Sequence, residues 1–457
     1  MMVNRTGSVG AAYPDNWSEM TPAQKRKWRL DNFLKAEKVN FVSEEAKQKY
    51  QIRAKRLVDF CNIEEPDRIP VVTPAGNLPY TLNGVSARTS MYDYEQAVAA
   101  CKKFNEKYAE ELEYYAVPVA TPGKVIDMMD YKMYAWPGHG LPLDSTGFQF
   151  VENEYMKADE YDDLIRDPSN FWLRKYLPRV FGGFEGLKAF APITGMVEVV
   201  SIPMLSTFAN PSVQETLLKL VEVGREYQRM QAITGPAINS AAYGFPSLPT
   251  SMAKAPFDTL GDTLRGTAAM MKDMYRRPDK VLEACDKIAD ITIDSIVKNP
   301  SAPNFLRITY PLHKGADGWM SKKQFDTFYW PSLKKVMDAF INEGLIQNLF
   351  AEGAFNSRLE YVNVFPKGTV TWLFDQTDMA KAKAALGNNC GIAGNVPTSL
   401  TVTGSPADVK AYCKKLIETC GKGGGYSLAA GATADNPKLE NLQAMMQAAR
   451  EYGTYRK

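Results

Sequence analysis

The C-terminal half of the chain repeats one pattern, a short apolar run followed by a longer amphipathic segment. Short apolar runs bounded by Gly, Pro, Asn or Asp are typical of buried strands, and apolar residues spaced three or four apart are typical of covering helices. We expect strands within residues 304–311, 345–353, 368–375, 388–396 and 424–432. We expect helices over residues 258–276, 278–298, 321–342, 405–420 and 436–450, and another beginning at Asp378. This alternation predicts βα units around a parallel sheet.

The pattern is less regular in the first half. Residues 21–60 carry many Lys, Arg and Glu and few apolar residues, which fits two surface helices. Further segments are expected as strands at 68–75, 114–121 and 193–202 and as a helix at 91–113. Residues 127–157 are aromatic and irregular, and we expect them to cross the mouth of a barrel. The domain prediction is a helical extension over 1–66 and a barrel over 67–457, with 127–180 as an insertion that caps it.

Composition narrows the class of protein. A chain of 457 residues suits one large α/β barrel, an architecture that runs from about 200 to over 400 residues. The 54 basic and 52 acidic residues leave a net charge of +2, which argues against a nucleic-acid surface. Six cysteines without a C-x-x-C pair exclude a cysteine-rich zinc module, and two histidines exclude a three-histidine metal site. We see no secretory leader and no apolar run of ~18 residues, so we expect a cytoplasmic protein without a membrane span.

Three ionisable residues follow successive predicted strands. Active residues of parallel barrels project from the C-terminal ends of strands, and here those ends carry His313, Glu352 and Asp375. If the strands are neighbours, the three side chains face one cavity, where they can perform acid–base chemistry or His313 and Glu352 can bind a divalent metal. Structural alternatives stay open: a hydrogen-bonded wall residue for His313, and a loop acceptor for Asp375. Glu352 is the strongest candidate, because a carboxylate beside a buried apolar run needs a partner.

Aromatic residues of the insertion are the candidate substrate-binding groups. Either they line an apolar pocket or they pack the insertion itself. The residues are Tyr134, Trp136, Phe148 and Phe150. Asn395 is a further candidate for hydrogen bonding to substrate, although Gly394-Asn395 can equally be a turn of the fold.

Two segments carry a resemblance to a known family. They are HKGADGWMSKKQFDTFYWPSLKKVMDAF, from His313, and GIAGNVPTSLTVTGSPADVKAYCKKLIETCGKGGGYSLAAGATADNPKLENLQAM, from Gly391. With DRIPV at 67–71, they resemble the uroporphyrinogen decarboxylase superfamily. The resemblance implies a (β/α)8 TIM barrel with an N-terminal helical extension. It also implies one of two activities, tetrapyrrole decarboxylation or corrinoid-dependent methyl transfer.

The residues at the family's motif positions discriminate between these activities. Decarboxylases of the family hold substrate carboxylates with an arginine-rich loop after the first strand, but the matching residues 73–80 contain no arginine, so we reject decarboxylation. Thiol-directed methyltransferases of the family carry zinc on His-x-Cys and a later Cys. The matching positions here are Phe350-Ala351-Glu352 and Ala430, so the usual zinc ligands are absent.

What remains resembles the longer, corrinoid-dependent O-demethylases of anaerobes. The resemblance implies a methyltransferase that moves a methyl group from a methoxylated aromatic to cobalamin. The chain has no Asp-x-His-x-x-Gly corrinoid motif, so we expect the corrinoid on a separate partner protein. Open alternatives are a methylamine or halomethane donor, and a non-catalytic tetrapyrrole- or corrinoid-binding protein. A homodimer is also left open.

Overall fold

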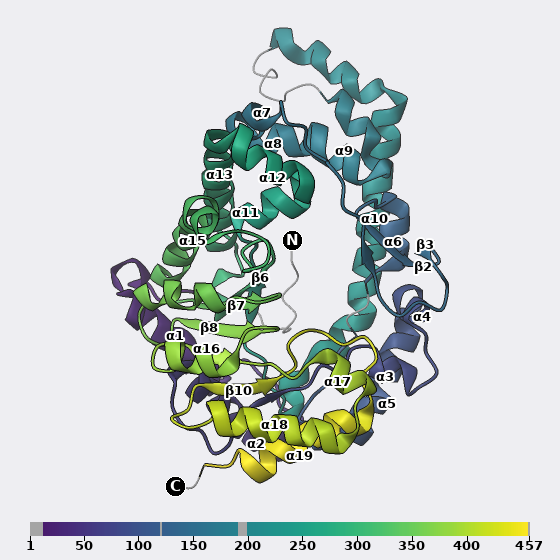
Figure 1. Ribbon diagram of the computed structural model, residues 1–457. Coiled ribbons are helices and arrows are strands. Elements are labelled where there is room, and N and C mark those ends of the chain that lie inside the picture. The colour runs from purple at the N-terminus through teal and green to yellow at the C-terminus, as the bar shows by residue number, and fades with distance from the viewer. Residues whose placement is uncertain (1–11, 119–120, 191–198, 456–457) are drawn as a thin grey trace.

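A curled sheet of parallel strands organises the C-terminal half of the molecule and lies beside an open centre (Figure 1). The computed structural model describes residues 12–118, 121–190 and 199–455. Within them the sheet has seven strands in the order β1-β10-β9-β8-β7-β6-β5. The strands are β1 (Val71–Val72), β5 (Thr250–Met252), β6 (Arg307–Leu312), β7 (Ile346–Ala351), β8 (Val370–Phe374), β9 (Gly391–Ala393) and β10 (Tyr426–Ala429). The predicted α/β class with a barrel-like parallel sheet is confirmed.

Helices of the C-terminal half cover the outer face of this sheet. They are α11 (Pro256–Asp258), α12 (Thr267–Arg276), α13 (Pro278–Val297), α14 (Lys322–Gln324), α15 (Trp330–Asn342), α16 (Met379–Leu386), α17 (Thr398–Thr403), α18 (Pro406–Cys420) and α19 (Leu439–Tyr452). In β6 every second residue is buried, so one face of the strand joins the core with α15 residues such as Phe340. Ser405 caps α18 by accepting a hydrogen bond from the Asp408 backbone N–H, ahead of Pro406 in the first turn. The sequence pattern and the observed elements agree closely in this half.

Two helices close the N-terminal ends of the strands. They are α1 (Pro22–Lys35) and α2 (Glu44–Asn62), within the segment expected to hold two helices. Their apolar residues, such as Phe33, pack with Leu306 and Ile346, which lie at the starts of β6 and β7. The opposite, C-terminal strand ends are therefore the end left open for a site.

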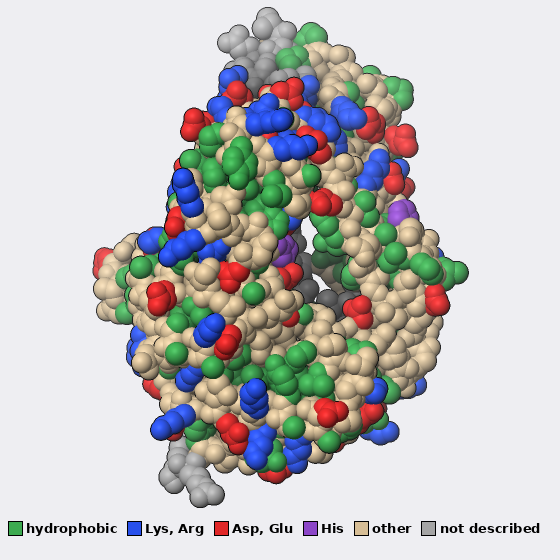
Figure 2. Space-filling model, in the orientation of Figure 1, with side chains coloured by type: hydrophobic (Ala, Val, Ile, Leu, Met, Phe, Trp, Pro, Cys, Tyr) green, Lys and Arg blue, Asp and Glu red, His purple; other side chains and the backbone are tan. Residues whose placement is uncertain are grey.

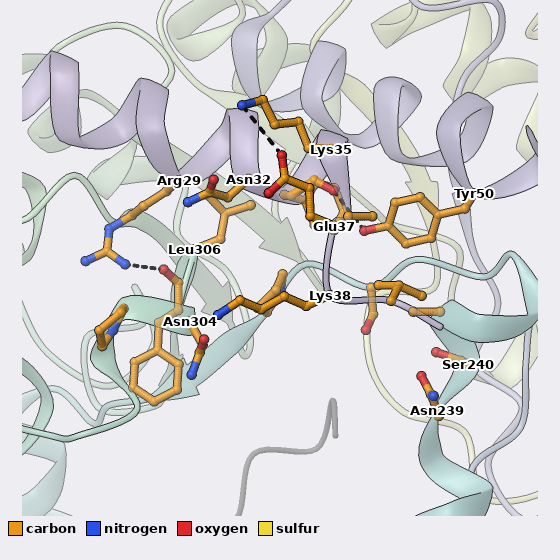
Figure 3. Close-up of a pocket in the computed structure, with 18 of the residues that line it drawn as sticks. Arg29, Asn32, Lys35, Glu37, Lys38, Tyr50, Asn239, Ser240, Asn304 and Leu306 are labelled. Atoms are coloured by element: carbon orange, nitrogen blue, oxygen red, sulfur yellow. Dashed lines mark hydrogen bonds and ion pairs between the residues drawn. The ribbon is translucent and has the colours of Figure 1, made fainter. Parts of the chain in front are cut away.

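A cavity of about 370 Å³ lies at this closed end, between α1 and the loops that precede β5 and β6 (Figure 3). Arg29 is buried beside it and donates hydrogen bonds to the backbone oxygens of Ala302, Phe305 and Glu343. These bonds tie α1 to the barrel. The cavity is thus at the end of the sheet away from the predicted site residues.

The first half is mainly helical, and of its described residues β1 alone joins the large sheet. Its helices are α3 (Leu78–Thr81), α4 (Ala87–Tyr92), α5 (Tyr94–Leu112), α6 (Gly123–Met129), α7 (Tyr161–Arg166), α8 (Pro168–Phe171), α9 (Leu177–Val180) and α10 (Pro211–Thr234). A small sheet in the order β3-β2-β4 is formed by β2 (Tyr134–Pro137), β3 (Gly140–Leu141) and β4 (Gln149–Phe150). We call residues 127–180 the cap; the domain boundaries themselves stay a prediction.

Three strand expectations differ from the structure. Residues 114–118 form no strand, and 119–120 of the expected strand 114–121 lie outside the described residues. Of the expected strand 193–202, residues 193–198 lie outside the described residues, and 199–202 belong to the 3-10 helix η5 (Val199–Ala209). Strand β5 was not expected, because its three residues are too short to show an alternating pattern.

The C-terminal ends of β6, β7 and β8 point toward an open centre, with α10 and the small sheet of the cap on the opposite side (Figure 1). The space-filling view shows the molecule hollowed at this place (Figure 2). None of the described helices combines the length and apolar character needed to cross a membrane.

Candidate active site

Strand register brings the three predicted residues to one level of the barrel rim. Leu312 of β6 pairs with Ala351 of β7, which in turn pairs with Phe374 of β8. The residue after each of these is His313, Glu352 or Asp375. The expectation that neighbouring strands would bring these side chains to one edge therefore agrees with the register.

The His313 imidazole lies between two carboxylates. Its Nδ1 is 2.6 Å from Oδ2 of Asp262, and its Nε2 is 3.3 Å from Oε1 of Glu352. Asp262 comes from the π-helical turn η8 (Thr259–Arg265) after β5, and its side chain is only 10% exposed, whereas that of Glu352 is 44% exposed. The row therefore runs from a buried carboxylate, through the imidazole, to a carboxylate that reaches solvent.

These neighbours fix the charge on the ring. Burial lowers the pKa of His313, but the hydrogen bonds to Asp262 and Glu352 outweigh burial and raise that pKa to about 10. For Asp262, burial raises the pKa, but the hydrogen bond from His313 and the nearby Lys254 ammonium lower it well below the usual range. At neutral pH His313 is therefore an imidazolium with both N–H groups directed at carboxylates.

Asp262 also receives two lysines. Lys254 Nζ is 2.8 Å from Asp262 Oδ2, and Lys314 Nζ is 3.1 Å from Oδ1. Lys314 additionally donates to Thr267 Oγ1 at 2.6 Å and lies 5.5 Å from the centre of the Trp319 ring. One buried carboxylate of η8 thus gathers three cationic groups from the ends of β5 and β6.

A second buried carboxylate holds the backbone beneath the imidazole. Asp258 is fully buried and accepts hydrogen bonds from the His313 N–H at 3.0 Å, the Lys314 N–H at 2.8 Å and the Tyr329 hydroxyl at 2.6 Å. Burial and the neighbouring Asp262 charge raise the pKa of Asp258. Because three donors converge on it, Asp258 fixes the turn at 313–314 and hence the direction of the ring.

Asp375 supports the turn that follows Glu352. Its Oδ2 accepts a hydrogen bond from the Gly353 N–H at 3.2 Å. The Asn395 amide in turn donates to the backbone oxygens of Asp375 and Thr377, each at 2.9 Å. Within the described residues no hydrogen bond or ion pair joins Asp375 to His313, so Asp375 and Asn395 brace the rim beside the cluster. Their predicted catalytic and substrate-binding roles stay predictions.

The cap aromatics divide into two groups. Tyr134 of β2 lies near enough to the cluster to be affected by its charges: burial first, and then the charges of Asp262 and Glu352, raise the pKa of its phenol. The Phe150 ring lies edge-on to Tyr134, with centroids 5.5 Å apart, so these two rings form an aromatic wall across from the ionisable groups.

The other two cap aromatics lie elsewhere. Trp136 is fully buried, stacks on His139 with centroids 3.9 Å apart and donates from Nε1 to the Tyr92 hydroxyl at 3.1 Å. Phe148 is 53% exposed. Trp136 therefore belongs to the packing of the cap, the alternative left open for these rings.

Sequence reasoning did not single out Asp258, Asp262 or Lys254. A signal was available, because Asp258 and Asp262 are four residues apart in an apolar stretch, which places both on one face of a helix. The sequence pattern did not predict β5, so the residues that follow β5 were not expected to lie at the C-terminal end of a strand.

The donor set does not fit the family's thiolate zinc site. All six cysteines are buried and unpaired. In the described part of the chain no group of three or more His, Cys, Asp and Glu side chains is arranged to hold a metal ion. The binding of a metal by His313 and Glu352 stays a prediction.

Comparison with known proteins agrees with this fold. The cluster stands at the C-terminal strand ends, where parallel α/β barrels carry their functional sites. Residues 248–452 match the family model "Uroporphyrinogen decarboxylase (URO-D)", and the resemblance stated from the sequence is confirmed. A solved structure described as "methyltransferase from Methanosarcina mazei" has the same fold, with a TM-score of 0.53 and 15% identity over 88% of this chain and 98% of that one. No curated protein matches the sequence.

Proposed function

We propose that this protein transfers a methyl group from a methoxylated aromatic compound to the cobalt of a corrinoid carried by a separate protein. The observation that supports the proposal most directly is the His313 imidazolium between Asp262 and Glu352, facing Tyr134 across the open rim. The similarity in fold to a methyltransferase and the absence of the family's arginine-rich loop support the same class.

His313 and Glu352 can supply the proton that the leaving oxygen needs, which is the main chemical requirement of the reaction. When the bond between methyl carbon and ether oxygen breaks, the methyl group goes to cobalt and the electron pair stays on oxygen. A phenolate is a poor leaving group unless a proton reaches the oxygen. The proton is held by the His313 imidazolium, whose Nε2 lies 3.3 Å from Oε1 of Glu352. The exposed Glu352 carboxylate can accept this proton as it passes one to the ether oxygen, which leaves His313 neutral and Glu352 ionised. Asp262 stays ionised and keeps the ring oriented.

The remaining roles are binding roles. The corrinoid, as the acceptor substrate, supplies the nucleophilic cobalt, so the chain needs no nucleophile of its own. Tyr134 and Phe150 offer a wall on which an aromatic donor can stack. Asp258 and Asp375 hold the backbone on either side of the proton-bearing pair.

Anaerobic methyl transfer to cob(I)alamin tests the proposal. The purified protein is incubated with methoxyarenes, methylamines and methyl halides, and the visible spectrum reports methylcobalamin. We expect methylation from a methoxyarene and a loss of roughly 10²- to 10⁴-fold in Glu352→Gln, since that change removes a general acid. Glu360→Gln, another exposed glutamate beyond the rim, is the matched control and should retain full activity.

The other outcomes discriminate between the alternatives. Methylation only from an amine or a halide keeps the class of enzyme and contradicts the donor. No methylation from any donor, even with a cognate corrinoid protein, contradicts the proposal and favours a non-catalytic binding protein.

A further inference from the structure

Lys254 is a cationic residue at the open rim that has no part in the proposed proton transfer. It follows β5, and its side chain is 29% exposed. Its ammonium lies 2.8 Å from Asp262 Oδ2 and donates to Thr263 Oγ1 at 3.3 Å. An ammonium has three N–H donors. Among the described residues these two partners are the ones it has, which leaves one donor for a ligand.

Lys314 provides an internal comparison, because it binds the same carboxylate. Its side chain is only 14% exposed, its ammonium donates to Thr267, and it lies against the Trp319 ring. The Lys314 ammonium is therefore already occupied by contacts within the protein. Lys254 is the more accessible of the two cations.

The charge balance around Asp262 favours an anion in front of Lys254. The His313 imidazolium, Lys254 and Lys314 all converge on the single Asp262 carboxylate. Glu352 pairs with the far nitrogen of His313, and the buried Asp258 carboxyl is engaged by the backbone at 313–314 and by the Tyr329 hydroxyl. The carboxylate that Lys254 contacts is Asp262, which it shares with His313 and Lys314. An accessible cation at the open rim attracts a negatively charged group on the ligand.

We propose that Lys254 binds an anionic oxygen substituent, a carboxylate or a phenolate, on the aromatic methyl donor. The inference rests on the proposed function and deepens it by naming a property of the substrate. Such a charge-assisted hydrogen bond positions the ring between Lys254 and the Tyr134–Phe150 wall, with the ether oxygen turned toward Glu352. Lys254 is thus a specificity-determining residue and not a proton donor.

Equilibrium binding without cobalamin tests this directly. Calorimetric titration compares 4-methoxybenzoate, which carries a carboxylate, with neutral methoxybenzene. A 2-methoxyphenol with a nitro group para to the hydroxyl, whose phenol ionises near neutral pH, is titrated below and above that pKa and reports the phenolate while Lys254 stays protonated. In Lys254→Met we expect affinity for the anionic ligands to fall roughly 10- to 100-fold, the usual range for a hydrogen bond to a charged group. Methoxybenzene should bind as before, and Lys254→Arg should recover most of the lost affinity. Lys323→Met, an exposed lysine on the outer surface, is the matched control.

Turnover adds a second readout. For the carboxylate donor, Lys254→Met should raise KM with kcat within about twofold, because the interaction is made in the ground state as well as in the transition state. An equal loss of affinity for charged and neutral ligands, or no loss for either, overturns the inference.

The failure of this inference and that of the proposed function are distinguishable. If methyl transfer depends on Glu352 but no ligand depends on Lys254, only the inference fails. If no donor is demethylated while 4-methoxybenzoate still binds through Lys254, the anion site stands and the proposed reaction fails.

Discussion

Residues 248–452 and residues 67–247 build their parts of the molecule in different ways. In the first of these regions strands β6 to β10 are each paired with a neighbour on both sides, and the register sets their ends at one level. In the part of the second region that the structure describes, β1 alone joins the sheet, and the cap reaches the rim through short strands and loops. The two regions therefore contribute different parts of the site. The ionisable groups lie on rigid strand ends, and the aromatic rings across from them lie on a separately attached segment.

The attachment between the two regions is a buried ion-pair network. Arg265 of η8 binds Asp273 of α12 at 2.6 Å and Glu154 of the cap at 2.5 Å. Asp273 also accepts a hydrogen bond from the Tyr161 hydroxyl at 2.8 Å. The same turn that supplies Asp262 to the site therefore holds the cap in place.

Breaking this attachment should have the largest effect on stability. In Arg265→Met the buried Asp273 carboxylate loses its cation, and removal of one partner from a buried pair costs about 3–5 kcal/mol. Urea unfolding should show this loss, and proteolysis should cut the cap first. Lys175→Gln, which removes an exposed pair with Asp163, is the control and should cost less than about 1 kcal/mol. A loss in Arg265→Met as small as in the control would mean that the cap is held by other contacts.

The same contrast explains what the sequence could predict. Strand ends at His313, Glu352 and Asp375 followed from apolar runs of five or six residues, because such runs have a recognisable length and boundary. Strand β5 has three residues and no such signal, so Asp262 and Lys254 at its end were missed. The cap has no periodicity at all, and which of Tyr134 and Trp136 faces the site depends on tertiary packing that no local pattern encodes.

The two cap aromatics give the next test, with a smaller expected effect. Tyr134→Leu should raise KM for an aromatic donor roughly 3- to 10-fold, the value of an aromatic contact, with little change in Tm. Trp136→Phe should instead affect stability and leave KM unchanged. This variant loses the hydrogen bond to Tyr92 and part of the stacking on His139, so its free energy of unfolding should fall by about 1–3 kcal/mol. If both variants change KM equally, the whole cap and not the Tyr134 face contacts the donor.

The smallest expected effect is the pH dependence of the rim itself. The pKa of His313 is raised from its ordinary value near 6.5 to about 10, so the folded protein holds this proton more tightly than the unfolded chain. The stabilisation is therefore complete below about pH 6.5 and is lost as the pH rises toward 10. The difference in unfolding free energy between the wild type and His313→Asn should be largest near pH 6 and shrink above it. Solvent limits its size, since the side chain is 31% exposed. Asp262→Asn should reduce this pH dependence of the unfolding free energy, because Asp262 is the stronger of the two acceptors of His313. If the difference in unfolding free energy between the wild type and His313→Asn stays constant from pH 6 to 10, His313 is neutral in the folded protein and cannot supply the proton that demethylation needs.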